Sequence, residues 1–142
     1  MLTHEKRIIA SAIDIGVVLI ISLIINIIIP NTIYNSDITF FVAYFIIGFV
    51  YMFLCLFFSK DRTIGLYFVS LRLLSDKWTR PDMKVIIIRS LAHGVIVLHL
   101  INILYMLLNK TTDSFFDKLA NSVIIKDSDA YNLINKNKDT NN

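Results

Sequence analysis

Asp14 is a carboxylate inside a long apolar run, and its chemistry poses the functional question. The run covers residues 8–29, with Arg7 directly before it. A charged side chain at the centre of a bilayer costs about 2.5 to 3.5 kcal/mol on insertion scales, so such a residue is normally paired or functional. An aspartate here can bind and release a proton or a cation, because burial raises the pKa of a carboxylate and a neighbouring cation lowers it. The alternative is a static contact that fixes helix packing, with Arg7, Arg89 or His93 as the partner.

Arg7, Ala10 and Asp14 share one face of the helix that this run predicts. At 3.6 residues per turn, positions i, i+3 and i+7 fall on one narrow stripe. Arg7 and Asp14 are then about 10 Å apart along the helix axis, so Asp14 needs another partner or water. We expect that partner on the third apolar run, where Arg89 and His93 are four residues apart and lie on one helical face.

Three apolar runs are long enough to cross a membrane as helices. They cover residues 8–29, 38–58 and 85–108, and at about 1.5 Å per residue each reaches roughly 30 Å or more, the thickness of a bilayer core. The composition agrees, since 56% of the residues are hydrophobic and 18% are charged, with a mean hydropathy of +0.65. We predict an all-α polytopic membrane protein with about three transmembrane helices. Residues 127–142 are too polar to pack and predict a disordered tail.

The basic residues predict the orientation of these helices. Residues 30–39, between the first two runs, contain no Lys or Arg, whereas the next loop carries Lys60, Arg62, Arg72, Lys77, Arg80 and Lys84. By the positive-inside rule, the N-terminus and this second loop are cytoplasmic. The alternating segment TIGLYFVSLRLLSD in the loop favours a small cytoplasmic strand with one buried face, and an amphipathic interfacial helix is the alternative.

The side of the membrane on which the C-terminal segment lies is a point of conflict. Three full crossings would place it outside. Its lysines, and a possible strand pairing of SVIIK with the SLRLL segment, argue for the inside. A bend of the third apolar run near Gly94 would resolve the conflict.

No enzyme, metal or cofactor site is expected. The sequence has no H-E-x-x-H, no phosphate-binding glycine loop, no G-x-S-x-G and no Cys/His metal spacing. His93 and His99 are six residues apart, on opposite helix faces, and cannot hold a metal together. A net charge of +3, without basic residues interleaved with exposed aromatics, argues against nucleic acid as a partner.

Several short motifs, in order along residues 6–126, resemble those of the RDD family of membrane proteins. The opening stretch KRIIASAID matches the family arginine with Arg7 and its first aspartate with Asp14. The later stretch FFDKLANSVII is similar to the family's H-D-x-L-A-G-T-x-V, which makes Asp117 the second aspartate. Between them, TIGL and SLRLL are similar to T-x-G-K and G-L-R-V, and Arg89 falls where an arginine often begins the last helical region. Four positions depart from the family's lysine, histidine, glycine and threonine: Leu66, Phe116, Asn121 and Ser122.

The resemblance implies a transmembrane domain over residues 6–126 in the cell (inner) membrane, and a transport role in which monovalent cations or small solutes are coupled to protons. In this hypothesis Asp14 binds the proton or cation, Arg7 sets its electrostatics, and Asp117 fixes the cytoplasmic segment by pairing with a basic group such as Arg7 or Arg72. Two further polar residues would support the site: Arg89 and His93.

The expected partners are the lipid bilayer and other membrane-embedded chains. One three-helix copy is too small to enclose a solvated pathway, so transport would require a homo-oligomer. The alternative function is that of a non-transporting anchor or assembly component that binds another membrane protein.

Overall fold

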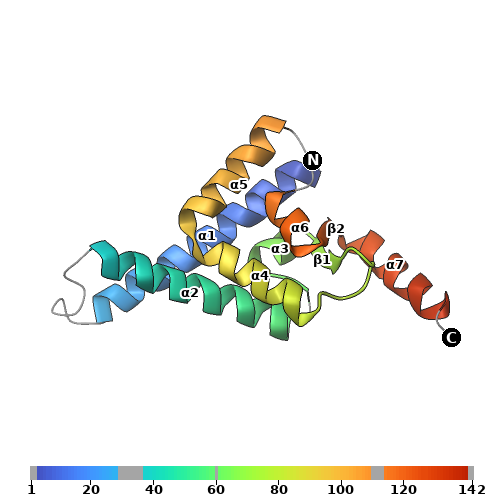
Figure 1. Ribbon diagram of the computed structural model, residues 1–142, viewed down its shortest axis with the longest axis horizontal. Helices are drawn as coiled ribbons and strands as arrows, with labels where there is room; N and C mark the ends of the chain where they lie inside the picture. The colour runs from blue at the N-terminus through green and yellow to red at the C-terminus, as the bar shows by residue number, and fades with distance from the viewer. Residues whose placement is uncertain (1–2, 29–36, 60, 110–113, 141–142) are drawn as a thin grey trace.

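Helices dominate the computed structural model of the protein, which describes residues 3–28, 37–59, 61–109 and 114–140. A single pair of short strands accompanies them in this part of the chain (Figure 1). In chain order the elements are α1 (Thr3–Ile28), α2 (Asp37–Phe58), α3 (Ile64–Phe68), β1 (Leu71–Ser75), α4 (Met83–Gly94), α5 (Ile96–Asn109), α6 (Phe115–Ala120), β2 (Ser122–Lys126) and α7 (Asp127–Thr140).

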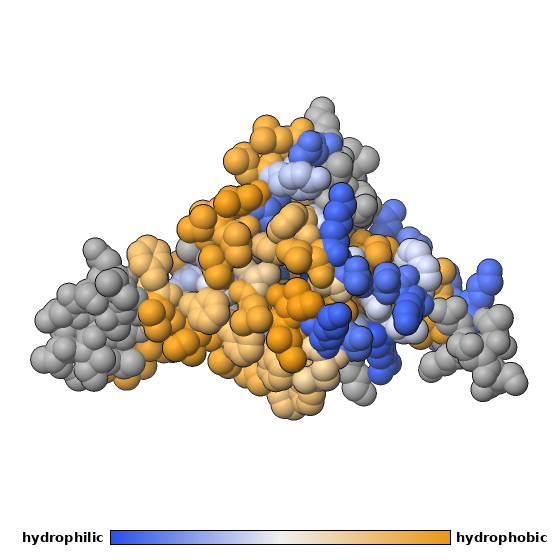
Figure 2. All heavy atoms as spheres, viewed as in Figure 1, coloured by the Kyte–Doolittle hydropathy of each residue, from blue (hydrophilic) through white to orange (hydrophobic). Residues whose placement is uncertain are grey.

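The first two predicted helices are confirmed as α1 and α2, and both are long and apolar enough to cross a membrane. Their many β-branched residues form helix because, in lipid, every backbone polar group must be satisfied within the segment. Only 22% and 28% of the residues in their most apolar windows are buried, so both helices keep apolar surface open to their surroundings. Figure 2 shows hydrophobic side chains over the part of one face formed by α1, α2, α4 and α5, as labelled in Figure 1. Hydrophilic side chains gather towards the end that carries the strands and α7.

The third predicted helix, residues 85–108, is two helices. α4 ends at Gly94, Val95 has an extended conformation, and α5 begins at the next residue. α4 packs along α2 as far as the middle of that helix, where a Cβ on Gly48 would lie 3.2 Å from the Gly94 Cα. α5 then returns towards the first half of α1 (Figure 1). At 12 and 14 residues, neither helix reaches the length of a full span.

The predicted strand in the second loop is correct for its second half only. β1 pairs antiparallel with β2, from Leu71 opposite Lys126 to Ser75 opposite Ser122, which confirms the expected pairing of these two segments. The first half, α3, is a short helix instead, because the Thr63 side chain caps it by accepting a hydrogen bond from the Leu66 amide at 3.2 Å. The segment with the alternating pattern therefore contains two elements, the helix α3 and the strand β1.

The C-terminal segment, predicted to be disordered, forms helix α7. It packs against β1 and β2, with Ala130 fully buried. Its first residue, Asp127, pairs with Arg62 and Arg72. These contacts hold a helix whose polar composition gives it little apolar surface to bury, and composition alone did not reveal them.

Candidate functional site

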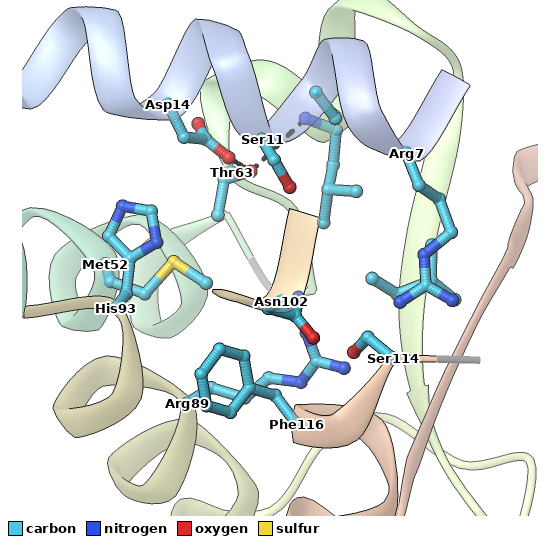
Figure 3. A pocket seen from close by; sticks show the side chains of 13 residues that line it. Arg7, Ser11, Asp14, Met52, Thr63, Arg89, His93, Asn102, Ser114 and Phe116 are labelled. Atoms are coloured by element: carbon cyan, nitrogen blue, oxygen red, sulfur yellow. Dashed lines mark hydrogen bonds between the residues drawn. The ribbon is translucent and has the colours of Figure 1, made fainter. Parts of the chain in front are cut away.

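Three neutral donors hold the buried Asp14 carboxylate, and Figure 3 shows one of them, Thr63. The Tyr51 hydroxyl donates to Oδ1 at 2.6 Å, and the Gly65 amide donates to the same oxygen at 2.8 Å. The Thr63 hydroxyl donates to Oδ2 at 2.7 Å. Asp14 is only 4% exposed and takes part in no ion pair among the described residues. The expectation that a basic residue of the third apolar run would be its direct partner is therefore wrong.

The predicted stripe on α1 faces the interior. Arg7, Ala10 and Asp14 are 4%, 2% and 4% exposed, so all three lie on the buried face of α1, which continues through Val18 and Ser22. The small Ala10 lets the chain at Gly65 approach α1: a Cβ on Gly65 would lie 2.1 Å from the Ala10 carbonyl oxygen. This close approach brings the Gly65 amide to the Asp14 carboxylate, and it requires glycine.

Asp117 is the centre of a second buried polar cluster. Its carboxylate pairs with Arg7 through Oδ2 and with Arg89 through Oδ1. It also closes a capping box at the start of α6: Oδ2 accepts from the Ser114 amide at 2.8 Å, and the Asp117 amide donates to the Ser114 hydroxyl at 3.1 Å. Arg89 further donates from Nε to the Ser122 hydroxyl at 3.0 Å. One carboxylate thus ties α1 to α4 and α6.

The basic partners of Asp117 differ in part from those expected. The Arg7 partner is present, but the second basic partner is Arg89, because the sequence places Arg72 on β1. There Arg72 contacts Asp61 at 3.5 Å and Asp127 at 2.9 Å instead. Burial raises the pKa of Asp61 above its ordinary value, although the Arg72 guanidinium and two neighbouring arginines lower it.

A small cavity of about 50 Å³ separates Asp14 from the Asp117 cluster (Figure 3). Its volume is enough for a few water molecules but not for an organic substrate. Four predicted site residues line it: Arg7, Asp14, Arg89 and His93. His93 is 4% exposed and its ring centroid lies 6.2 Å from that of Tyr51. The structure therefore brings the predicted residues together around one cavity, with Asp117 bound to two of them.

Two residues that depart from the family pattern line the same cavity. Leu66 stands where the family pattern has lysine, and Phe116 stands where it has histidine. Both are buried, at 4% and 8% exposed. The cavity of this chain is therefore more apolar on two of its walls than the family pattern would make it.

Several residues of the site were not singled out from the sequence. Tyr51 is one of several aromatic residues on the second apolar run, and Asn102 is a neutral amide on the third, so neither stands out in the sequence. Asn102 accepts from the Phe115 amide at 3.2 Å and so links α5 to α6. The TIGL motif was the available signal for Thr63 and Gly65, since the Thr63 hydroxyl and the Gly65 backbone amide both donate to Asp14.

No metal centre is formed by the described residues, among which no three His, Cys, Asp or Glu side chains are grouped to hold an ion. The side chain of His99 lies outside what the structure describes.

One of three sequence and structure comparisons identifies a family for this chain. The family model described as RDD family matches residues 3–121, which include Arg7, Asp14 and Asp117. No curated protein and no solved structure matches the chain. With both buried clusters and most of the chain inside the matched region, the protein belongs to the RDD family.

Proposed function

We propose that this chain is a cell-membrane protein that exchanges protons for small monovalent cations, with Asp14 as the carboxylate that binds them. The observation that carries the proposal is the set of neutral donors around Asp14. Two of the three donors are hydroxyl groups, from Tyr51 and Thr63. A hydroxyl can donate to a carboxylate or turn its lone pairs towards a proton or cation bound there. A fixed arginine partner would not leave this freedom.

The cavity beside Asp14 supports the same proposal. It offers polar side chains from α1, α4 and α5, among them Ser11, His93 and Asn102. Broken helices that line a polar cavity at membrane depth are typical of ion-coupled transporters. α4 and α5 have this character, since the helix breaks at Val95 beside the middle of α2.

The arrangement of α4 and α5 supports a topology of two crossings and one returning hairpin. In this topology α1 and α2 cross the membrane, and the α4–α5 hairpin enters and leaves on the cytoplasmic side. The pairing of β1 with β2 and the contact of Arg7 with Asp117 both join the N-terminal half to the segment after α5. The positive charge of the second loop favours the cytoplasm for this side.

The proposal includes a homo-oligomer. A cavity of about 50 Å³ in one copy does not form a continuous pathway. Additional copies would cover the exposed apolar faces of α1, α2 and α5 and complete the pathway between them.

Proton flux in liposomes tests the proposal. The purified chain would be reconstituted with an internal pH-sensitive dye, and a sodium or potassium gradient would be imposed. In the wild type, protons should move across the membrane in the direction opposite to the cation. Asp14→Asn keeps the size of the side chain and one accepting oxygen but cannot ionise, so it should insert normally and lose the flux.

The matched control is Asp129→Asn, which removes one exposed carboxylate from α7 and should keep full flux. Equal flux in the wild type and Asp14→Asn would contradict the role of Asp14. Absence of flux from the wild type with either cation would contradict transport and leave the anchoring function as the alternative.

A further inference from the structure

A second hollow shares one wall with the Asp14 site. It has a volume of about 500 Å³ and is lined by Ser59, Arg62, Thr63, Ile64, Tyr67 and Arg72. Thr63 lines both this hollow and the cavity at Asp14. The polar groups on the lining side chains are guanidinium and hydroxyl groups, and no carboxylate is among them. The lining therefore presents hydrogen-bond donors, which suit an oxyanion, while ion pairs with Asp61 and Asp127 offset the charge of its two arginines.

The two arginines of the hollow already converge on an oxygen. Arg72 Nε lies 2.9 Å from Asp127 Oδ1, and Arg62 Nη2 pairs with the same atom. Asp61 helps to fix both guanidinium groups, at 3.5 Å from Arg72 and 3.9 Å from Arg62. A guanidinium has five N–H donors in a rigid fork that matches the oxygens of a phosphate. The pair is thus pre-arranged for an oxyanion, with the carboxylate of Asp127 taking one position.

The surroundings of the hollow identify the source of that oxyanion. Phe57 and Phe58, in the last turn of α2, are 49% and 71% exposed, and Tyr67 and Phe68 of α3 are 68% and 71% exposed. Tyrosine is enriched at the headgroup level of a bilayer, and Tyr67 itself lines the hollow, next to the end of the spanning helix α2. The donors of the hollow consequently lie where lipid phosphates lie.

We propose that this hollow binds the phosphate of an anionic phospholipid headgroup through Arg62 and Arg72. Basic pockets on the cytoplasmic side of membrane helices take such headgroups. Asp127 competes with the phosphate for the guanidinium groups and so lowers the affinity of the site. Since Thr63 forms the wall between this site and Asp14, a bound headgroup would lie directly beside the Asp14 cavity. The proposal does not depend on transport.

Thermal unfolding of the full chain in neutral detergent tests the site. The probes are short-chain phosphatidylglycerol, short-chain phosphatidylcholine and inorganic phosphate, each titrated separately. Phosphatidylglycerol should raise the unfolding temperature in a saturable way, and phosphatidylcholine should raise it much less. An equal rise with inorganic phosphate supports the site but assigns it to a soluble ligand. No saturable rise with either anionic probe would overturn the proposal.

Charge-matched variants separate specific binding from general attraction. Arg62→Gln combined with Arg72→Gln should abolish the rise caused by phosphatidylglycerol. The control combines Lys84→Gln with Lys118→Gln, two exposed residues outside the hollow, and removes the same net charge. It should keep the rise. The same loss in both double variants would overturn the site.

A third variant keeps the test decisive if the double arginine variant does not fold. Asp127→Asn preserves the shape of the competing side chain and removes its charge. If Asp127 only stabilises α7, the variant loses stability without any gain in lipid affinity. The proposal instead requires tighter binding of phosphatidylglycerol, by roughly threefold for a partly exposed charge. Unchanged or weaker binding would overturn the proposal.

Discussion

Gly65 and Ala10 are in backbone contact: a Cβ at residue 65 would lie 2.1 Å from the Ala10 carbonyl oxygen and 2.9 Å from the Asp14 Cγ. The contact brings the start of α3 against α1 and places the Gly65 amide 2.8 Å from the Asp14 carboxylate. A side chain at residue 65 would force these two segments apart. The position of Asp14 relative to its donors thus depends on one glycine.

Gly65→Ala should therefore destabilise the protein markedly. Adding a methyl group against backbone atoms costs at least about 1 to 3 kcal/mol, because backbone cannot move aside as a side chain can. Unfolding by heat or denaturant in detergent would measure the loss. Gly16→Ala is the matched control, since a Cβ there meets nothing within 4 Å and alanine favours helix. Equal stability of the two variants would contradict the contact.

Asp117→Asn should destabilise the packing of α6 on α1 and α4. Removing one partner from a buried ion pair costs about 3 to 5 kcal/mol, because the remaining charge stays buried. Asparagine can still accept from the Ser114 amide, so the change isolates the charge from the helix cap. The same unfolding measurement applies, with Asp129→Asn as an exposed control. A comparable loss in both variants would show that Asp117 contributes no more than a surface carboxylate.

Asp61 should make stability depend on pH with a defined sign. Burial raises its pKa in the folded protein. The contribution of Asp61 to folding stability is therefore present in full below its pKa in the unfolded chain, about 3.9. It is lost as the pH rises through its pKa in the folded protein. The wild type should lose stability relative to Asp61→Asn when the pH is raised from about 4 towards neutrality. A relative gain over that range would mean that the arginine contacts outweigh burial.

The α4–α5 hairpin predicts that both ends of the described chain lie on one side of the membrane. The test introduces single cysteines at two exposed positions, Glu5 and Asn132, in a Cys55→Ser background. An impermeant maleimide should label both from the cytoplasmic side only, with lysed vesicles as the control for reactivity. Labelling from opposite sides would mean that the segment from α4 to α5 crosses the membrane.

The long apolar helices were predictable because a continuous apolar run in lipid has one backbone solution, the α-helix. The buried stripe of Arg7, Ala10 and Asp14 followed from helical periodicity alone. The strand character of β1 followed from the alternation of residues along its own segment. These features depend on short stretches of sequence, in which the periodicity of apolar and polar residues is enough to predict the local structure.

The features that sequence did not predict depend on contacts between distant segments. Helix α3 forms where Gly65 meets Ala10. The break at Val95, beside the close packing of Gly48 against Gly94, is the exception, because it agrees with the bend near Gly94 that was expected from the sequence. The neutral partners of Asp14 come from α2 and the α3 start, which no spacing along α1 can indicate. The pairing of Arg7 with Asp117 was expected only through the family resemblance.

That pairing also sets an order of events during synthesis. Asp117 follows Arg7 by 110 residues, an interval of roughly 5 to 20 s at ordinary rates of translation. Throughout that interval α1 must be accommodated by the membrane without the carboxylate that finally binds its arginine. Although α1 is made before α6, it thus reaches its final environment only once α6 has been made, and the C-terminal segment completes the folding of the N-terminal one.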